Sequence, residues 1–406
     1  MFGDILKNSL LKEIQKIESS LIEYRRYLHR NAEVGFELPE TVEFVKNKLQ
    51  EFSCDVEPCG KNGLVTVIGD KNNVTVLLRA DMDALPVKEE SDVEFLCNTG
   101  NMHVCGHDMH TAMLLGTARL LKKHEKELRS GVKLMFQPAE EVLSGAKNML
   151  ENGLLEGDKI KGAIMLHVMA GLPLKTGTVI VSSGGVGAPA ADYFTINIQG
   201  KGCHGSTPQQ GVDAINIASH TVIALQEISA RELSLSDEAV LTIGSFKSGT
   251  AGNVIADTAV LQGTMRAYDD NVREYVKKRL TEICSGVAET FRGKSVVSFG
   301  AGCPTLVNDE SLSEMVENNT KELFKENEVL NTNSFGTRTN RSGGSEDFSY
   351  ISHEVPSVMI ALAAGNSEEG YIYPQHHPKV KFDEAVLPIG CAVFTYNAIK
   401  LSEKFK

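Results

Sequence analysis

Short apolar runs that end beside acidic residues or a histidine recur through the first half of this sequence. Asp81 and Asp83 follow one such run. Glu140 and Glu141 follow a second, and His167 ends a third. Apolar runs of this length predict strands that helices bury on both faces, and in an open α/β sheet ligands bind at the edge where the strands end. The recurrence therefore predicts an α/β domain with a mainly parallel sheet and a site at one edge. The runs lie at residues 64–68, 75–78, 132–136 and 163–166.

A cluster of groups that bind metals lies between the first and second of these acidic pairs. Cys105 and His107 stand two residues apart, so both side chains can point the same way in extended or turning backbone, and one ion could bind both. His103 and His110 lie close by. A buried thiol with solvated imidazoles is the alternative for such a cluster taken alone. The further donors elsewhere in the chain favour metal.

The residues after this cluster have the spacing of a helix that packs on a core. Apolar residues recur at helical positions from about residue 109 to residue 124. Asp108 stands directly before them, and we expect its carboxylate to accept hydrogen bonds from the first amides of the helix as its N-cap.

Composition and charge exclude several kinds of partner. A net charge of −12 over 406 residues argues against a nucleic-acid partner, which would favour a basic surface. The first 30 residues interrupt their apolar positions with charges, which predicts an amphipathic helix and neither a signal peptide nor a membrane span. The eight cysteines are scattered without a tight framework. We therefore expect reduced thiols, a cytoplasmic location and no membrane partner.

The pattern of the chain changes near residue 186 and changes back near residue 302. Between them the apolar periodicity predicts the order β-α-β-β-α-β, which is typical of the split βαβ sandwich. We interpret residues 187–301 as an inserted domain. Residues 1–186 and 302–406 then form one discontinuous domain that carries the metal-binding residues.

The candidate donors outnumber the needs of one metal ion. A tetrahedral catalytic ion with an open position for water takes three protein ligands. Two divalent ions about 3.5 to 4 Å apart, which clamp water and substrate between them, would use all five. The donors are Cys105, His107, Glu141, His167 and either His376 or His377.

The adjacent pair Glu140 and Glu141 indicates a mechanism. Neighbouring residues of extended backbone point to opposite sides, so the two carboxylates are not expected to serve one ion equally. One can bind metal while the other takes a proton from water and passes it to a leaving nitrogen. A solvated surface pair is the alternative, and their position after a buried strand disfavours it.

At this point the sequence resembles the aminoacylase and carboxypeptidase family of metallo-amidohydrolases, and especially the branch of hippurate hydrolases, N-acyl-amino-acid deacylases and auxin-conjugate (IAA-amino acid) hydrolases. The resemblance covers nearly the whole chain in order. It implies a zinc-peptidase-like α/β catalytic domain and an inserted ferredoxin-like α+β lid that also dimerises. The motifs that carry it are RADMDALP, CGHDMHTAMLLG, FQPAEE, GKGCHGSTPQQGVDAI, GTAGNVIADTAVLQGTMR, GSEDFSY and HHPKVKFDE.

The resemblance implies a role for each candidate residue of the metal site. Glu140 becomes the catalytic base, and the pattern His, any residue, Pro selects His376 over His377. Other branches carry a His-x-Asp motif where this chain has Asp81-Met82-Asp83, so Asp83 either orients a ligand or caps a strand end. The implied metal ligands are Cys105, His107, Glu141, His167 and His376.

The resemblance also implies a substrate-binding role for three residues of the inserted domain. His204 would contact the substrate carbonyl from a partner subunit and stabilise the developing oxyanion. Asn253 and Arg266 would recognise a carboxylate, for which a guanidinium is suited by its planar pair of donors. A surface ion pair is the alternative for Arg266. The motif at residues 344–350 is expected to line the site or to cap a helix.

The function predicted from these observations is metal-dependent hydrolysis of an N-acyl-L-amino acid (acetyl, benzoyl or similar) to a carboxylic acid and the free amino acid. A homodimer or higher homo-oligomer with two divalent ions, which could be Zn, Mn, Co or Ni, is implied. A dipeptidase or carboxypeptidase is the nearest alternative. An amidase with Cys105 as nucleophile and a non-catalytic metal-binding protein are further ones. The sequence does not identify the acyl group or the amino acid.

Overall fold

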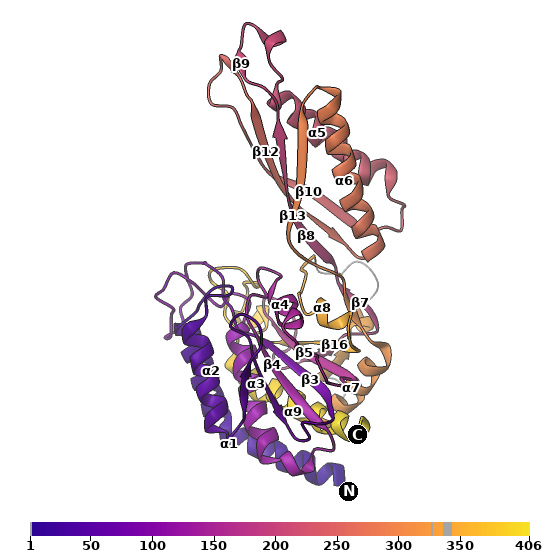
Figure 1. Ribbon diagram of the computed structural model, residues 1–406. Helices are drawn as coiled ribbons and strands as arrows, with labels where there is room; N and C mark the ends of the chain where they lie inside the picture. Colours follow the sequence, from indigo (N-terminus) through magenta and orange to yellow (C-terminus); the bar gives the residue numbers. More distant parts are fainter. Residues whose placement is uncertain (1, 326–327, 336–342) are drawn as a thin grey trace. The chain divides into compact units, whose positions relative to one another are not determined.

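The computed structural model describes residues 2–325, 328–335 and 343–406 of the chain. They form two compact units, each with its own sheet and helices (Figure 1). The larger unit comprises residues 1–187, 307–341 and 347–406, and the smaller unit comprises residues 188–306 and 342–346.

The larger unit is built on an eight-stranded mixed sheet. In spatial order its strands are β1 (Val56–Pro58), β2 (Leu64–Ile68), β4 (Gly131–Gln137), β3 (Val74–Asp81), β5 (Gly162–Met169), β16 (Ser357–Ala363), β6 (Val179–Val181) and β15 (Val329–Asn331). The central strands β4, β3, β5 and β16 are parallel to one another. Every residue of β3 and β4 is buried, so both faces of the sheet are covered there. The predicted mainly parallel α/β sheet is confirmed.

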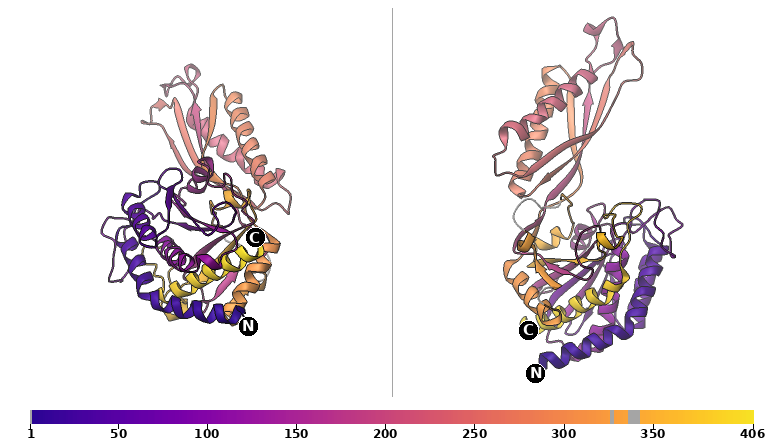
Figure 2. Two further views of the ribbon diagram at one scale, coloured as in Figure 1. Left: turned by 60° about the horizontal axis from the view of Figure 1, so that its bottom comes forward. Right: turned by 180° about the vertical axis from the view of Figure 1, so that it is seen from behind.

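Helices pack on the sheet of the larger unit. They are α1 (Phe2–Arg30), α2 (Pro39–Glu51), α3 (His107–Lys123), α4 (Gly145–Glu151), α7 (Glu310–Leu323), α8 (Ser349–Ser352) and α9 (Leu387–Lys404). α3 and α9 pack on β3, and α1 lies along both of them (Figure 2). α9 has the length and apolar composition of a membrane-crossing helix, but 78% of that apolar stretch is buried in the core of this unit.

The start of α3 differs from the prediction. The helix begins at His107, and its N-cap is Gly106, which has a φ of +89°. Asp108 is therefore inside the first turn and is not the N-cap. Its carboxylate accepts hydrogen bonds from Arg25 Nε at 2.9 Å and makes a 2.8 Å hydrogen bond with His29 Nδ1. Oδ1 of Asp108 still accepts a hydrogen bond from the amide of Met109 at 2.9 Å, while Oδ2 binds the two side chains of α1.

The smaller unit has the predicted order β-α-β-β-α-β. Its antiparallel sheet contains, in spatial order, β10 (Ala239–Ser248), β12 (Thr258–Ala267), β8 (Ala190–Gln199) and β13 (Lys294–Cys303). Helices α5 (Ala214–Glu227) and α6 (Asp270–Thr290) pack on this sheet and share its apolar core. β9 (Cys203–His204) and β11 (Val254–Ile255) form a two-stranded ribbon. β7 (Gly185–Ala188) and β14 (Leu306–Asn308) pair where the chain passes between the units.

Candidate metal centre

The parallel strands of the larger unit bring the predicted donors to one edge. β3 ends at Asp81, and β4 ends three residues before Glu140. His167 lies two residues before the end of β5. Because β3 is parallel to both β4 and β5, the carboxyl ends of the three strands meet at the same edge of the sheet. Residues far apart in the sequence therefore converge there.

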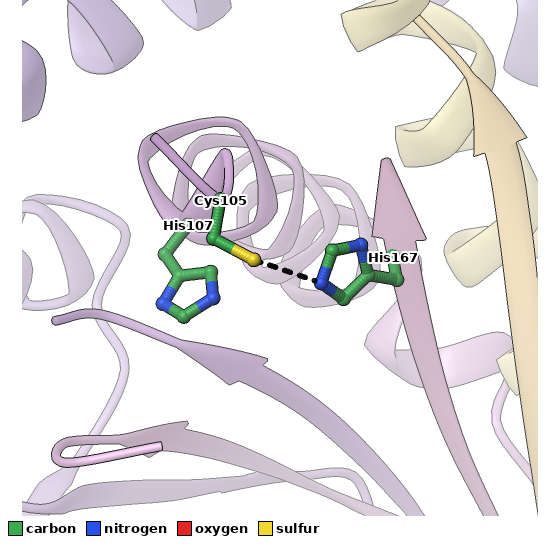
Figure 3. A group of neighbouring side chains, drawn as sticks. All are labelled: Cys105, His107 and His167. Carbon is green, nitrogen blue, oxygen red and sulfur yellow. Dashed lines mark hydrogen bonds between the residues drawn. The ribbon is translucent and has the colours of Figure 1, made fainter. Parts of the chain in front are cut away.

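Cys105, His107 and His167 form the first group of donors (Figure 3). Their ligand atoms all lie within 4.8 Å of one another. Cys105 Sγ is 3.4 Å from His167 Nε2. Gly106 makes this possible through its left-handed backbone, which turns the chain between the two side chains that share the group.

Cys105, Glu141 and His376 form a second group within the same 4.8 Å limit, so Cys105 belongs to both. His376 Nε2 is 3.5 Å from Glu141 Oε1. His377 instead stacks its ring on Tyr373, with the ring centroids 4.3 Å apart. The structure thus places His376, and not His377, among the donors.

The two neighbouring glutamates do not diverge as predicted. Glu140 Oε2 and Glu141 Oε1 each lie 3.9 Å from His107 Nε2. The prediction assumed extended backbone, but Ala139 has a φ of +56° and Leu143 a φ of +52°, so the chain turns on both sides of the pair. Both carboxylates consequently face the same imidazole.

Asp83 holds this turn. Its carboxylate accepts hydrogen bonds from the backbone amides of Glu140 at 3.0 Å and Glu141 at 3.2 Å. Its Oδ1 atom also lies 3.5 Å from His107 Nδ1. Of the two roles considered for Asp83, it therefore orients the residues of the site, and it does so through the turn that follows β4.

Burial and neighbouring charges perturb the donors strongly. Burial raises the pKa of Glu141 to about 7, although the charge of His107 opposes this. Burial lowers the pKa of His167 to about 3, and His110 adds to the effect. For His107 burial also opposes protonation, but the negative charge of Asp81 and the nearby carboxylate of Asp83 outweigh it and raise the pKa. Such perturbed groups in one place are typical of functional sites.

The donor set fits divalent cations. Both ring nitrogens of His107 and Oε1 of Glu141 are buried without a hydrogen-bond partner among the described residues. Buried polar atoms are normally satisfied, so these three atoms indicate a missing partner. Thiolate, imidazole and carboxylate are together the ligands of Zn²⁺ and its transition-metal neighbours.

The predicted substrate-binding residues lie in the smaller unit, in two places. His204 pairs with Val254 across the β9–β11 ribbon, and its exposed ring contacts Ser206 Oγ at 2.7 Å through Nδ1. Asn253 is exposed beside it, and its carbonyl accepts a hydrogen bond from the amide of Gly205. Arg266 is the second-last residue of β12, and its Nη1 atom donates a hydrogen bond to Ser345 Oγ at 3.3 Å.

A buried polar network behind the donors was missed by the sequence analysis. Asp81 binds both Arg79, at 2.7 Å, and His110, at 2.6 Å. Asp347, from the motif at residues 344–350, accepts hydrogen bonds from Arg79 Nη2 at 3.2 Å and Gln137 Nε2 at 2.7 Å. The available signal was the spacing of His107 and His110, which are three residues apart and so share one face of α3.

Comparisons with known proteins identify the family of this chain. The family model described as Peptidase family M20/M25/M40 matches residues 77–399. Thermostable carboxypeptidase 2 of Saccharolobus solfataricus is 36% identical over 409 residues, which cover 98% of this chain and 100% of the relative. N-acetyl-L-cysteine deacetylase of Bacillus subtilis is 34% identical over 390 residues, with 95% of this chain and 89% of the relative covered.

A solved structure extends the comparison to the fold. A Bacillus subtilis protein described as a dinuclear metal-binding peptidase of the M20 family has a TM-score of 0.77 and 28% identity to this chain, with coverage of 96% and 99%. The match of fold and sequence confirms the predicted family and its hydrolase chemistry on amide or peptide bonds. This chain belongs to the M20/M25/M40 peptidase family.

Proposed function

We propose that this protein is a metal-dependent amidohydrolase that cleaves the amide bond of N-acyl-L-amino acids. The observation that carries the proposal is the convergence of five donors of transition-metal type with a further carboxylate, Glu140, facing the same imidazole. The deacetylase named among the relatives acts on a substrate of this class.

Two divalent cations, of Zn, Mn, Co or Ni, would be held by the two donor groups that share Cys105. When bound there, such ions polarise a carbonyl oxygen and lower the pKa of a water molecule. The protein's part is to fix the donors, which it does through the left-handed Gly106 and the Asp83-bound turn. The residues that would hold the ions are Cys105, His107, Glu141, His167 and His376.

Glu140 is the group we assign to proton transfer. Its side chain is 8% exposed, and its backbone amide donates a hydrogen bond to the Asp83 carboxylate at 3.0 Å. A carboxylate in this position can accept a proton from the attacking water and deliver it to the leaving amide nitrogen. A buried, positioned carboxylate serves this role better than a solvated one, because its geometry is set before the substrate arrives.

Substrate binding is assigned to three residues of the smaller unit. The His204 imidazole can donate a hydrogen bond to the developing oxyanion, which often contributes several kcal/mol. Arg266 can pair with the α-carboxylate of the amino acid, and Asn253 can add an amide contact.

We also propose a homodimer or higher homo-oligomer, in which His204 acts on the partner's substrate. Analytical ultracentrifugation of wild type and mixing of His204→Ala with Glu140→Gln subunits would test this by recovery of activity.

A carboxypeptidase or dipeptidase is the second candidate, favoured by the 36% identity to a carboxypeptidase. Both activities would use the same centre, so the acyl side of the substrate separates them. A third candidate, a cysteine nucleophile, is disfavoured because burial raises the pKa of Cys105 and so opposes the free thiolate. Purified protein loaded in turn with each of the four metals should be assayed against acetyl, benzoyl and longer-chain conjugates and against dipeptides.

The direct test is Glu140→Gln, which keeps the shape of the side chain but removes its basicity. We expect two bound metal equivalents and a fall in kcat of about 10²- to 10⁴-fold. Glu156→Gln, an exposed position of the larger unit, is the matched control and should behave as wild type. Loss of metal in Glu140→Gln would show that this carboxylate is a ligand, and unchanged turnover would remove it from the mechanism.

A further inference from the structure

His110 is a fully buried imidazole with both ring nitrogens in use. Its Nδ1 atom lies 2.6 Å from Asp81 Oδ1, and its Nε2 atom accepts a hydrogen bond from the backbone amide of Val168 at 2.9 Å. Because an amide can only donate, Nε2 carries no proton, and in the neutral ring Nδ1 must carry it. His110 therefore donates to Asp81 and accepts from β5 at the same time.

Asp81 connects this imidazole to the first group of donors. Its second oxygen accepts a hydrogen bond from Arg79 Nη1 at 2.7 Å and lies 3.6 Å from His107 Nε2. The hydroxyl of Thr111, the residue after His110, donates to the Asp81 carbonyl at 2.7 Å. Asp81 is thus fixed from three sides, and its carboxylate lies against the imidazole of His107.

Val168 connects His110 to His167. The carbonyl of Val168 is within 2.7 Å of His167 Nδ1 and within 2.8 Å of Gln375 Nε2. A carbonyl can only accept, so His167 carries its proton on Nδ1 and leaves Nε2 toward Cys105. The rings of His110 and His167 are also in edge contact, with centroids 4.7 Å apart. The orientation of His167 therefore depends on where the end of β5 is held.

We propose that His110 is a positioning residue that ties β3, through Asp81, to β5, through the Val168 amide, and so sets the spacing of His107 and His167 for metal binding. This inference rests on the proposed function, because it concerns the same two ions. The ligand atoms of Asp81, His107 and His110 lie within 4.8 Å of one another, as in a metal site. As a ligand, however, His110 would leave the buried amide of Val168 without its acceptor.

Three substitutions of His110 separate its hydrogen bond to Asp81 from its hydrogen bond to the Val168 amide. His110→Asn keeps a donor near the position of Nδ1 and so can still bind Asp81. His110→Gln carries its amide further out, where the oxygen can still accept from the Val168 amide. His110→Ala keeps neither. His124→Ala, at the other end of α3 and bonded to Glu13 and Glu127, is the control for general loss of helix stability.

The decisive measurement is titration of the metal-free proteins with Co²⁺, followed by the absorption of the Cys105 thiolate–cobalt bond. We expect His110→Ala to bind Co²⁺ about 10- to 100-fold more weakly than wild type, which is typical when a hydrogen-bond partner of a metal ligand is removed. The Asn and Gln variants should each lose less. With metal at saturation, the Gln variant should show a lower kcat at unchanged KM, while His124→Ala keeps wild-type affinity.

The outcomes that overturn the inference are specific. Wild-type Co²⁺ affinity and spectrum in His110→Gln and His110→Asn would do so, and they decide the matter even if His110→Ala fails to fold. A lower melting temperature of the metal-free variants without any change in affinity would also reduce His110 to a structural role. The proposed function would survive either result, provided that wild type binds two ions and Glu140→Gln is inactive.

Discussion

The candidate metal centre of the larger unit and the proposed substrate-binding residues of the smaller unit are built on opposite principles. At the candidate metal centre the side chains of His107 and Glu141 are almost fully buried, and the amide of Glu141 donates a hydrogen bond to the Asp83 carboxylate. On the smaller unit His204 is exposed on a two-stranded ribbon, and Asn253 is exposed directly before its second strand. Groups that bind ions must be held in advance, whereas groups that meet a substrate must remain accessible to it.

Backbone strain shows the same contrast. Six residues other than glycine have a positive φ in the described part of the chain, and three of them, Ala139, Leu143 and His376, are donors of the centre or border them. In the smaller unit Arg292 is the one described case. Left-handed backbone in ordinary residues is costly and persists only where the surroundings impose it. Three of the five such residues described in the larger unit therefore lie in or near the candidate site, while Ser53 and Asn62 lie elsewhere in that unit.

Removal of metal should give the largest effect and should act on one unit only. We expect EDTA to abolish turnover and added divalent metal to restore it, which a thiol mechanism would not require. By mass action, metal at 100 times its Kd stabilises the protein that binds it by about 2.7 kcal/mol. Hydrogen exchange should therefore rise at residues 104–110 and 139–143 in the metal-free protein and stay unchanged in β12 and α6. An equal rise in hydrogen exchange in both units would show that metal binding does not stabilise the larger unit alone.

A pair of glycine substitutions should have effects of opposite sign in the two units. At Gly106, φ is +89° and an added Cβ would lie 2.4 Å from Val168 Cγ2. The left-handed backbone alone costs alanine about 1–2 kcal/mol. We expect Gly106→Ala to weaken metal binding at least about tenfold, since each 1.4 kcal/mol is a factor of ten.

The matched change is Gly286→Ala, on the exposed side of α6, where an added Cβ meets nothing within 4 Å. It should stabilise the protein by about 0.5–1 kcal/mol and leave metal affinity unchanged. Denaturant unfolding and metal titration measure both variants. Wild-type metal affinity in Gly106→Ala would mean that the loop between Cys105 and His107 adapts.

Arg266→Ala tests the recognition side of the comparison. Loss of a charge-assisted contact worth about 1.5–3 kcal/mol should lower kcat/KM by about 10- to 150-fold, mainly through KM, while both metals stay bound. Arg279→Ala, in the same unit and ion-paired with Glu232 at 2.8 Å, should leave kinetics unchanged. Steady-state kinetics across conjugates with and without a free α-carboxylate would show whether the penalty requires that group. A penalty independent of the carboxylate would remove Arg266 from its recognition.

The elements of the fold could be predicted from sequence where local pattern determines them. β2 was expected at 64–68, and the structure has it there. The helix expected from about residue 109 to residue 124 is α3, His107–Lys123. The β-α-β-β-α-β order of the smaller unit also follows from local periodicity, because each element buries one face.

Features of the site that depend on distant partners could not be predicted. The turn at Glu140 depends on Asp83, more than fifty residues away, and the extended backbone assumed for that pair is wrong. Asp108 is drawn from its expected capping role by Arg25 and His29 of α1. The pairing of Asp81 with His110 requires β3 and α3 to be placed in three dimensions. Local patterns contain none of these contacts.

The smallest expected effect is on pH dependence, and it too should come from the larger unit. His29 is buried between Asp108, at 2.8 Å from Nδ1, and Glu89, at 3.1 Å from Nε2. Burial opposes protonation of His29, but the hydrogen bonds to the two carboxylates outweigh it and raise its pKa. In the folded protein His29 therefore keeps a proton that the unfolded chain loses near pH 6.5.

The sign follows from linkage. Above about pH 6.5 the His29 position binds fewer protons in the unfolded state than in the folded state. The contribution of His29 to the free energy of unfolding therefore falls with rising pH until its folded pKa is passed, by at most about 1.4 kcal/mol per pH unit. His107 and His124 have raised pKa values and act in the same direction, so the total slope does not isolate His29. The difference in slope between metal-free wild type and His29→Gln does. Equal slopes from pH 6.5 to 8.5 in urea unfolding would show that the α1 contacts of Asp108 do not depend on the charge of His29.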